Sequence, residues 1–370
     1  MSSLKPIGAI TGNLKQNQTG MANYAFNILQ GLSANYKITQ IADHTGDIIR
    51  GYQCIHPKNP PIPFNYLIWS LSASLQKKLF SQFDLIHNMC QYPVYPPKNK
   101  KYIITIFDLI PILFPELVTP VYAWQSRNLL PRVLERSDKI LAISEHTKRD
   151  LIIRYQIPPD KIDVTHLGVS NHFRPYDHDL IQQYKLKKSL LNPYILFVGA
   201  LEPKKNIPNL IKSFWMCLKK KPDLNLVLAG KPSWKYDEIF SLIHSLKLEK
   251  KIRVLNFIPY EELPLLYNGA EVFVFPSKYE GFGLPPLESM KCGTPVIVSN
   301  RSSLPEIVGE NGLMVNPDNV LELKNLILKI IENPDYRRKL KEYYMKQAEK
   351  FTWEKCIQNT IQSYESILMK

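Results

Sequence analysis

The chain has 370 residues, enough for about two domains that each bury a core of their own. Its 45% hydrophobic and 22% charged residues exclude fibrous, collagen-like and intrinsically disordered proteins. The net charge of +14 favours an anionic partner such as a phosphate, a nucleotide, a nucleic acid or an acidic lipid surface, and the alternative is a solvated basic surface.

Short apolar runs rich in β-branched and aromatic residues alternate with longer segments of helical period, and this alternation predicts an α/β fold with parallel strands. The first set of expected strands covers residues 6–10, 38–42, 83–87, 102–107, 139–143 and 162–166. The second set covers residues 194–198, 225–229, 252–257, 272–276 and 295–298. A polar stretch at 171–192 lies between the sets, so the domain boundary is predicted near Phe173.

Buried parallel strands with helices on both faces predict two doubly wound domains, 1–172 and 173–352, each open at the carboxyl ends of its strands. Two such crevices facing one another would form a central cleft. After Asp318 the pattern is helical over residues 320–332, 334–350 and 353–369. The last helix, 353–370, could return to brace the first domain, which periodicity alone does not decide.

The five cysteines are widely spaced and include no CxxC pair, which argues against a disulfide framework and against a zinc site. We therefore expect a reducing compartment. The N-terminal segment lacks the pattern of a secretory signal, and no apolar run approaches the ~18 residues of a membrane span. The expected location is the cytoplasm, with at most peripheral docking on the cytoplasmic membrane face.

The most informative segment is residues 272–299, VFVFPSKYEGFGLPPLESMKCGTPVIVS, which reads as a strand, a loop, a helix and a second strand. Gly281 and Gly283 allow the loop backbone to approach a ligand closely, and the helix N-terminus that follows favours an anion such as a diphosphate. Glu280 and Glu288 frame the loop as acceptors for sugar and ribose hydroxyls. For an isolated pair, a loop charge and a first-turn acid would be the preferred interpretation, whereas the surrounding glycines and prolines favour a site.

The run from 275 to 317, FPSKYEGFGLPPLESMKCGTPVIVSNRSSLPEIVGENGLMVNP, resembles the signature of retaining GT-B glycosyltransferases of family four, the glycosyl transferases group 1. The likeness covers most of the chain, through TGMANY (19–24), IFDLIPILFPE (106–116), ISEHTKRDL (143–151), THLGVSNHFRP (165–175) and VGALEPKKNIPNLIKSF (198–214). It implies two Rossmann-like domains with the active site between them, and a nucleotide sugar bound mainly by the C-terminal domain.

The resemblance also implies roles for the matching residues. Glu280 would bind the transferred sugar and Glu288 the ribose, while Lys205 and Lys204 would stabilise the leaving diphosphate. The other donor-binding positions that it implies are Gly281, Phe282, Gly283, Leu284, Gly199 and Gly20. The alternative, that Lys204 and Lys205 are surface charges at the start of a helix, is disfavoured because cations are unfavourable at that end, whereas Gly20 alone would be an ordinary turn.

One position departs from the family pattern. The family commonly has histidine before the aspartate of the IFDLI segment, and this chain has Phe107 before Asp108. Phenylalanine can only pack or stack against a sugar, whereas histidine would contact the transferred sugar or help position the acceptor. We assign Asp108 to the catalytic group, and Phe107 and Ser144 to the acceptor side. Ser144 is equally a candidate helix N-cap.

No metal ion and no organic cofactor is expected. Asp177 and Asp179 form a DxD string, but they lie in the polar stretch between the domains rather than at a strand end. The GFGLPP segment lacks the third glycine of a dinucleotide-binding fingerprint, and the eight histidines show no metal-ligand spacing.

The sequence therefore predicts a retaining enzyme that moves a hexose, mannose or glucose first, from a GDP- or UDP-linked donor to a hydroxyl of a glycan or lipid-linked acceptor. A nucleic-acid partner is not expected, and contact with an anionic membrane is a possible use of the basic surface. Two alternatives stay open. One is another nucleotide-sugar enzyme of the same fold, such as an epimerase or a phosphorylase, and the other is a catalytically silent binding subunit, which Phe107 motivates.

Overall fold

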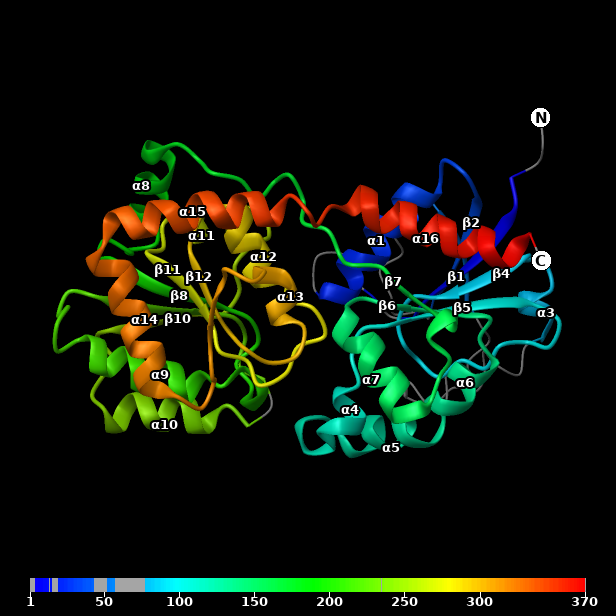
Figure 1. Ribbon diagram of the computed structural model, residues 1–370, viewed down its shortest axis with the longest axis horizontal. Coiled ribbons are helices and arrows are strands. Elements are labelled where there is room, and N and C mark those ends of the chain that lie inside the picture. The colour runs from blue at the N-terminus through cyan, green and yellow to red at the C-terminus, as the bar shows by residue number, and fades with distance from the viewer. Residues whose placement is uncertain are drawn as a thin grey trace. The chain divides into compact units, whose positions relative to one another are not determined.

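The computed structural model describes residues 4–12, 14, 19–42, 52–56, 77–233 and 235–369. The chain forms two compact units, which Figure 1 shows in ribbon form. Unit 1 comprises Met1–Gly168 and Thr352–Lys370, and unit 2 comprises Val169–Phe351. The division after Gly168 falls shortly before the boundary expected near Phe173, and the C-terminal segment belongs to unit 1.

Unit 1 is built on one seven-stranded sheet whose pairings all run parallel. Its strands are β1 (Pro6–Gly12), β2 (Lys37–Ala42), β3 (Gln53–Ile55), β4 (Leu85–Asn88), β5 (Lys101–Ile106), β6 (Lys139–Ala142) and β7 (Ile162–Val164). They are ordered β3-β2-β1-β4-β5-β6-β7, so the direction of winding reverses between β1 and β4. In such sheets, ligands bind beyond the carboxyl ends of the strands at this reversal.

The helices of unit 1 lie between its strands in the chain, except for the last helix, which comes from the end of the chain. They are α1 (Gly20–Leu32), α3 (Lys77–Phe80), α4 (Ile110–Leu113), η1 (Pro115–Leu117), α5 (Pro120–Asn128), α6 (Leu130–Arg136), α7 (Glu145–Tyr155), η2 (Pro159–Lys161) and α16 (Trp353–Leu368). Helix α16, red in Figure 1, packs along α1. The packing is close, because a Cβ added to Gly31 of α1 would strike the side chain of Ile357.

A buried hydrogen-bond chain fixes α16 to the sheet. The Tyr364 hydroxyl lies 2.7 Å from His87 Nδ1, and His87 Nε2 lies 2.7 Å from Thr105 Oγ1. Thr105 is also 2.7 Å from the hydroxyl of Tyr24 on α1. Burial lowers the pKa of His87 to about 3, so its imidazole is neutral. Each of these buried polar groups thus has a partner, which is the condition for a stable polar cluster in a core.

Unit 2 repeats the same architecture with six parallel strands. Its strands are β8 (Tyr194–Val198), β9 (Asn225–Ala229), β10 (Ile252–Leu255), β11 (Val272–Phe275), β12 (Val296–Ser299) and β13 (Leu313–Val315). Its helices are α8 (His178–Lys187), η3 (Pro203–Lys205), α9 (Ile207–Cys217), α10 (Asp237–Ser245), α11 (Leu263–Asn268), α12 (Leu284–Lys291), α13 (Leu304–Val308), α14 (Val320–Glu332) and α15 (Pro334–Ala348). The order β10-β9-β8-β11-β12-β13 places the reversal between β8 and β11.

Each of the five cysteines, all within the described residues, carries a thiol that is not part of a disulfide. Within the described part of the chain, every helix is too short or too polar to cross a membrane.

Candidate active site

The strongest candidate site of unit 2 is the loop that joins β11 to α12, residues 276–283, which we name the β11 loop. It begins where a fully buried strand ends, and it leads into α12 through Gly283, whose φ of +131° is unfavourable for other residues. A Cβ added there would also lie 2.9 Å from the side chain of Leu304. The amides of the first turn of α12 have no side-chain cap, and such a helix N-terminus can bind an anion.

Within the β11 loop, Glu280 forms an ion pair with Lys205. Lys205 Nζ lies 2.7 Å from Glu280 Oε1, and the two side chains are 11% and 12% exposed. Burial alone would raise the pKa of Glu280, but the Lys205 ammonium, with Lys204 nearby, holds this pKa below its usual value. Glu280 is therefore ionised near neutral pH. The structure thus places a buried carboxylate and a buried ammonium side by side.

Lys205 reaches Glu280 because neighbouring strands end together. Strand β8 pairs with β11, and Lys205 lies in η3, which follows β8 as Glu280 follows β11. The Lys205 ammonium also lies 4.9 Å from the centre of the Phe275 ring, a favourable position for a cation. Lys204 lies beside this pair, with its Nζ 3.3 Å from Glu202 Oε1, and its carbonyl accepts from Lys278 N at 2.8 Å. Both predicted cations therefore lie at the reversal point of the sheet.

Two serines that the sequence did not single out hold the β11 loop in place. Ser302 Oγ accepts from Glu280 N at 2.9 Å, and the single proton of Ser303 Oγ is shared between Glu280 O at 2.9 Å and Phe282 O at 2.6 Å. Ser302 has a φ of +54°, which is uncommon for a residue with a side chain. The sequence pointed to these two serines only through their place in the run 275–317, which carries the family resemblance.

Glu288, the second predicted carboxylate, is 8% exposed and lies one turn into α12. Its Oε2 accepts a hydrogen bond of 2.8 Å from the hydroxyl of Tyr267 on α11. Burial raises the pKa of Glu288 to about 7, although the hydrogen bond from Tyr267 opposes the shift. This carboxyl therefore changes charge in the neutral pH range. Tyr267 is a positioning contact that sequence reasoning missed.

The remaining predicted donor-site residues of unit 2 lie at the end of the β11 loop, at the start of α12 and after β8. Gly281 is buried, and Phe282 is 3% exposed with its ring 5.8 Å from that of Phe351, so its side chain serves packing. Leu284 is the first residue of α12. Gly199 follows β8 with a φ of +151°, and its carbonyl is so close to Gly230 that a Cβ there would strike it.

In unit 1, the predicted residues lie at the carboxyl ends of the strands. Phe107 and Asp108 directly follow β5, and Gly20 is the first residue of α1, capped by Thr19 Oγ1, which accepts from Ala22 N at 3.1 Å. Phe107 is 7% exposed, and its ring meets that of Tyr24 edge-on at 5.3 Å. The phenylalanine is thus packed into the unit.

The carboxylate of Asp108 and the hydroxyl of Ser144 both bind local backbone. Asp108 Oδ1 accepts from Ile110 N at 3.0 Å at the start of α4. Ser144 is fully buried and is the N-cap of α7, where its Oγ accepts from Thr147 N at 3.0 Å. The structure thus gives Ser144 the capping role, and its acceptor contact stays a prediction.

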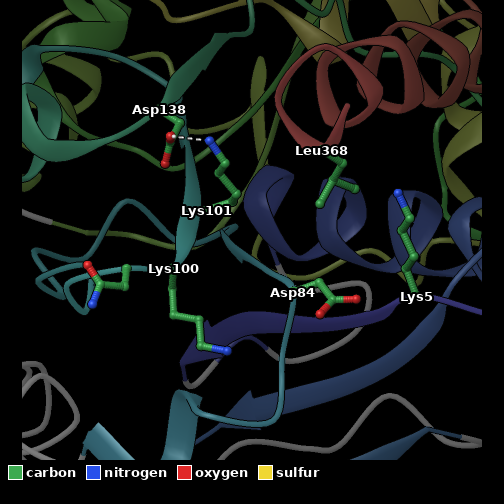
Figure 2. A pocket seen from close by; sticks show the side chains of 7 residues that line it. Lys5, Asp84, Lys100, Lys101, Asp138 and Leu368 are labelled. Atoms are coloured by element: carbon green, nitrogen blue, oxygen red, sulfur yellow. Dashed lines mark hydrogen bonds and ion pairs between the residues drawn. The ribbon is translucent and has the colours of Figure 1, made fainter. Parts of the chain in front are cut away.

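Two pockets lie away from these residues, at the amino ends of the strands. The pocket in Figure 2, of about 640 Å³, lies in unit 1. Two of its lysines are already engaged, because Lys100 donates to two carbonyls and Lys101 lies 3.5 Å from Asp138. A second pocket of about 480 Å³ in unit 2 is lined by residues that include Arg337 and Glu271, which form an ion pair. Neither pocket contains a predicted site residue.

Among the described residues, no three His, Cys, Asp or Glu side chains are grouped so that they could hold a metal ion. The DxD string lies at the exposed start of α8, where Asp177 is the N-cap residue. It is therefore not at a strand end.

Comparison with known families matches both halves of the chain. Glycosyltransferase Family 4 matches residues 18–172, and Glycosyl transferases group 1 matches residues 181–347. The chain belongs to the glycosyl transferases group 1. It is a glycosyltransferase, and the two matches meet close to the division between the units.

Two bacterial mannosyltransferases are among the relatives of this glycosyltransferase. The chain is 32% identical to O-antigen chain mannosyltransferase B of Escherichia coli over 275 residues, which cover 73% of this chain and 71% of that protein. It is 31% identical to O-antigen chain mannosyltransferase RfbU of Salmonella typhimurium over 282 residues, which cover 75% and 74%.

Solved structures confirm the fold of this glycosyltransferase. HepE of Anabaena, in complex with UDP and glucose, has a TM-score of 0.81 at 18% identity, with 98% of this chain and 100% of that chain covered. Both units of the chain therefore have the GT-B architecture that the sequence predicted.

Proposed function

We propose that this glycosyltransferase moves a hexose, mannose first, from a nucleotide diphosphate sugar to a hydroxyl of a glycan or lipid-linked acceptor, with retention of anomeric configuration. The observation that carries the proposal is the buried Lys205–Glu280 pair at the carboxyl ends of β8 and β11. The names of the relatives, which are O-antigen chain mannosyltransferases, support mannose as the transferred sugar.

The charges of unit 2 fit a donor of this kind. A diphosphate carries negative charge that Lys205, Lys204 and the N-terminus of α12 can stabilise as it leaves. Glu280 is ionised and can accept hydrogen bonds from the hydroxyls of the hexose. Glu288 can accept hydrogen bonds from the ribose. HepE, which shares the fold, was solved with UDP and glucose, and this supports a nucleotide sugar as the donor.

Transfer with retention needs no nucleophilic side chain in the mechanism that we propose. The bond from the anomeric carbon to the diphosphate oxygen breaks, and a bond to the acceptor oxygen forms on the same face. The acceptor proton passes to an oxygen of the leaving phosphate. Cations that meet the developing charge on that phosphate stabilise the transition state more than the ground state. Lys205 is suited to this role because burial strengthens its electrostatic interactions.

We further infer a cytoplasmic enzyme that makes peripheral contact with an anionic membrane where its acceptor is lipid-linked. The net charge of +14 supports this contact, since each Lys or Arg near such a surface contributes about 1 kcal/mol. The apolar segment Tyr66, Leu67, Ile68 and Trp69, a candidate for the contact, lies outside the described residues.

The test of donor binding is a thermal-shift panel of GDP-mannose, UDP-glucose and their nucleotides with the 370-residue chain. A donor that binds only the folded protein raises the melting temperature by mass action. We expect GDP-mannose to give the largest shift and E288Q to reduce it. No shift with any nucleotide sugar at saturating concentration would contradict the proposal.

A further inference from the structure

We propose that Gln91 is a positioning residue for the transfer reaction, because its side-chain amide holds the backbone of Phe107 and Asp108 at the carboxyl edge of the unit 1 sheet. The inference rests on the proposed function and on the sequence-based assignment of Phe107 to the acceptor side and Asp108 to the catalytic group. Gln91 belongs to none of the sequence segments that carry the family resemblance.

The location of Gln91 is the place where a doubly wound sheet binds its ligand. Strand β4 pairs with β1 on one side and with β5 on the other, and the winding reverses between β1 and β4. Gln91 follows β4, and Phe107 and Asp108 follow β5. The three residues therefore lie at neighbouring strand ends beside the reversal point.

The backbone at Gln91 is held in an unfavourable conformation. Its φ is +58°, in the left-handed region that glutamine seldom adopts, and the residue is 4% exposed. The buried side chain of Asn88 fixes the turn around it, since Asn88 Oδ1 accepts from Cys90 N at 3.2 Å and Asn88 Nδ2 donates to Tyr92 O at 2.6 Å. The ring of Tyr92 in turn lies against Gly12, where an added Cβ would be 2.6 Å away.

The side chain of Gln91 reaches the backbone of the neighbouring dipeptide with both halves of its amide. Gln91 Oε1 accepts from Phe107 N at 2.7 Å and lies 3.4 Å from Asp108 N. Gln91 Nε2 donates to Asp108 O at 2.8 Å. This complementary pairing fixes both the position and the orientation of the peptide units, which a single hydrogen bond would not do.

Other contacts hold the same dipeptide by its remaining groups. The carbonyl of Phe107 accepts from Thr147 Oγ1 at 3.3 Å, and its ring packs on Tyr24. Asp108 Oδ1 accepts from Ile110 N. Gln91 binds the remaining backbone groups, Phe107 N and Asp108 O, from the end of β4. Removal of the Gln91 side chain therefore leaves these groups without their partner, and the Asp108 carboxylate and the Phe107 ring shift together.

The strained backbone and the buried side chain of Gln91 together distinguish a positioning role from the need for a left-handed turn alone. If the chain needed only a left-handed turn here, glycine would adopt it without cost. A residue that keeps a strained backbone while its side chain binds one dipeptide points to a positional requirement at that dipeptide. Displacement of reacting groups by about 1 Å costs up to about 100-fold in rate.

The test compares Q91G with Q156G in the 370-residue chain. Gln156 is the matched control: it lies in unit 1 with a φ of +53°, but it is exposed and is the C-cap of α7. Both substitutions place glycine at a left-handed position and so remove backbone strain. A difference in activity between the two variants therefore does not arise from strain. The readouts are kcat and KM for transfer from GDP-mannose to an alkyl α-mannoside, the Kd of GDP-mannose, and the urea unfolding curve.

We expect Q91G to lower kcat by about 10- to 100-fold, with the Kd of GDP-mannose within about twofold of wild type, and Q156G to leave both unchanged. Q91E keeps the oxygen that accepts from Phe107 and loses the donor to Asp108, so we expect a smaller loss of kcat. If Q91G does not fold, Q91E decides the question alone.

A kcat equal to that of the wild-type chain in folded Q91G or folded Q91E would overturn the positioning role. The proposed function would stand in that case, because the wild-type chain would still transfer the sugar. An equal loss in Q91G and Q156G would also overturn it, because the effect would then belong to the unit as a whole. Absence of transfer by the wild-type chain from both GDP-mannose and UDP-glucose would overturn the proposed function, and the positioning role with it.

Discussion

At the scale of single residues, the site depends on two carboxyls whose surroundings drive their pKa values in opposite directions. The Lys205 ammonium offsets the burial of Glu280 and keeps it charged, whereas Glu288, which accepts a hydrogen bond from a tyrosine hydroxyl and pairs with no cation among the described residues, has a pKa of about 7. Glu280 in the β11 loop and Glu288 in α12 therefore differ in charge at the same pH, which suits them to different groups of the donor.

The first prediction concerns Glu280. E280Q removes the charge but keeps a hydrogen-bond acceptor beside Lys205, and we expect it to cost at least about 2 kcal/mol of transition-state stabilisation, read from kcat/KM. The Kd of the nucleotide should stay near that of wild type, since the lysines and helix amides that meet the diphosphate are unchanged.

The matched control for E280Q is E262Q. It also removes one partner of an ion pair in unit 2, because Lys188 Nζ lies 2.7 Å from Glu262 Oε2, but neither residue is predicted in the site. Equal effects of E280Q and E262Q on kcat/KM would contradict a catalytic role for Glu280.

The second prediction concerns the pH dependence of stability that Glu288 produces. Its pKa is raised from 4.5 to about 7 in the folded chain, so between these values the folded chain binds a proton that the unfolded chain has released. The contribution to the free energy of unfolding is therefore largest below about pH 4.5 and is lost as the pH rises through about 7, by on the order of 3 kcal/mol. E288Q, which does not titrate, should lack this decline.

The measurement is urea unfolding of wild type and E288Q without nucleotide, at pH 5.5 and pH 8. We expect the stability of wild type relative to E288Q to fall between the two values, because the buried carboxyl becomes charged. A difference that is the same at both values would show that Glu288 does not titrate in this range, and would contradict the environment described for it.

At the scale of elements, the site is a set of loops that strands place and serines hold. The β11 loop is fixed by Ser302 and Ser303 from the segment after β12, so the carboxyl ends of three neighbouring strands contribute to one site. Rigid support of this kind is what a pre-organised electrostatic site requires.

The third prediction tests this support with a matched pair. Ser303 and Ser213 are both fully buried, and each has its Oγ within hydrogen-bond distance of two carbonyls, but those of Ser213 are Asn209 O and Val320 O, away from the site. We expect S303A and S213A each to lose about 1–2 kcal/mol of stability, since buried carbonyls lose their donor. Only S303A should also lower kcat/KM. A loss of kcat/KM in both variants would contradict the positioning role of Ser303.

Most elements could be predicted from the sequence, because buried parallel strands are continuous apolar runs. The expected strands at 194–198 and 225–229 have the bounds that the structure gives to β8 and β9. Strands β3 and β13 were missed, although the equally short edge strand β7 was predicted, because β7 has two β-branched residues whereas β3 and β13 have one each.

The residues that support the site were harder to predict than those that form it. Glu280, Glu288 and Lys205 lie in motifs, and the structure brings Glu280 and Lys205 together. Gln91, Tyr267 and Ser303 act through contacts with residues far away in the chain, and a single sequence carries no signal for such contacts. Their roles appear only once strand order and burial are known.

At the scale of the whole molecule, the chain folds into two units of like topology and returns at its end to the first. Sequence periodicity predicted the last helix but not its location, since an amphipathic helix of that length can pack on either unit. The location of α16 in unit 1 depends on tertiary contacts, such as that between Tyr364 and His87. The net charge of +14 is also a property of the whole chain.

The central claim is that this chain transfers a hexose from a nucleotide sugar through a site in which lysines, rather than a bound cation, meet the leaving diphosphate. The most direct measurement is a transfer assay with GDP-mannose and an alkyl α-mannoside in the presence of EDTA, with the product identified by mass and by the NMR signal of its anomeric proton. We expect release of GDP that depends on the acceptor, a product heavier by one hexose, and an α-anomeric signal that matches the donor. Release of nucleotide without a transfer product, or transfer that stops with EDTA and returns with Mn²⁺ or Mg²⁺, would contradict the claim.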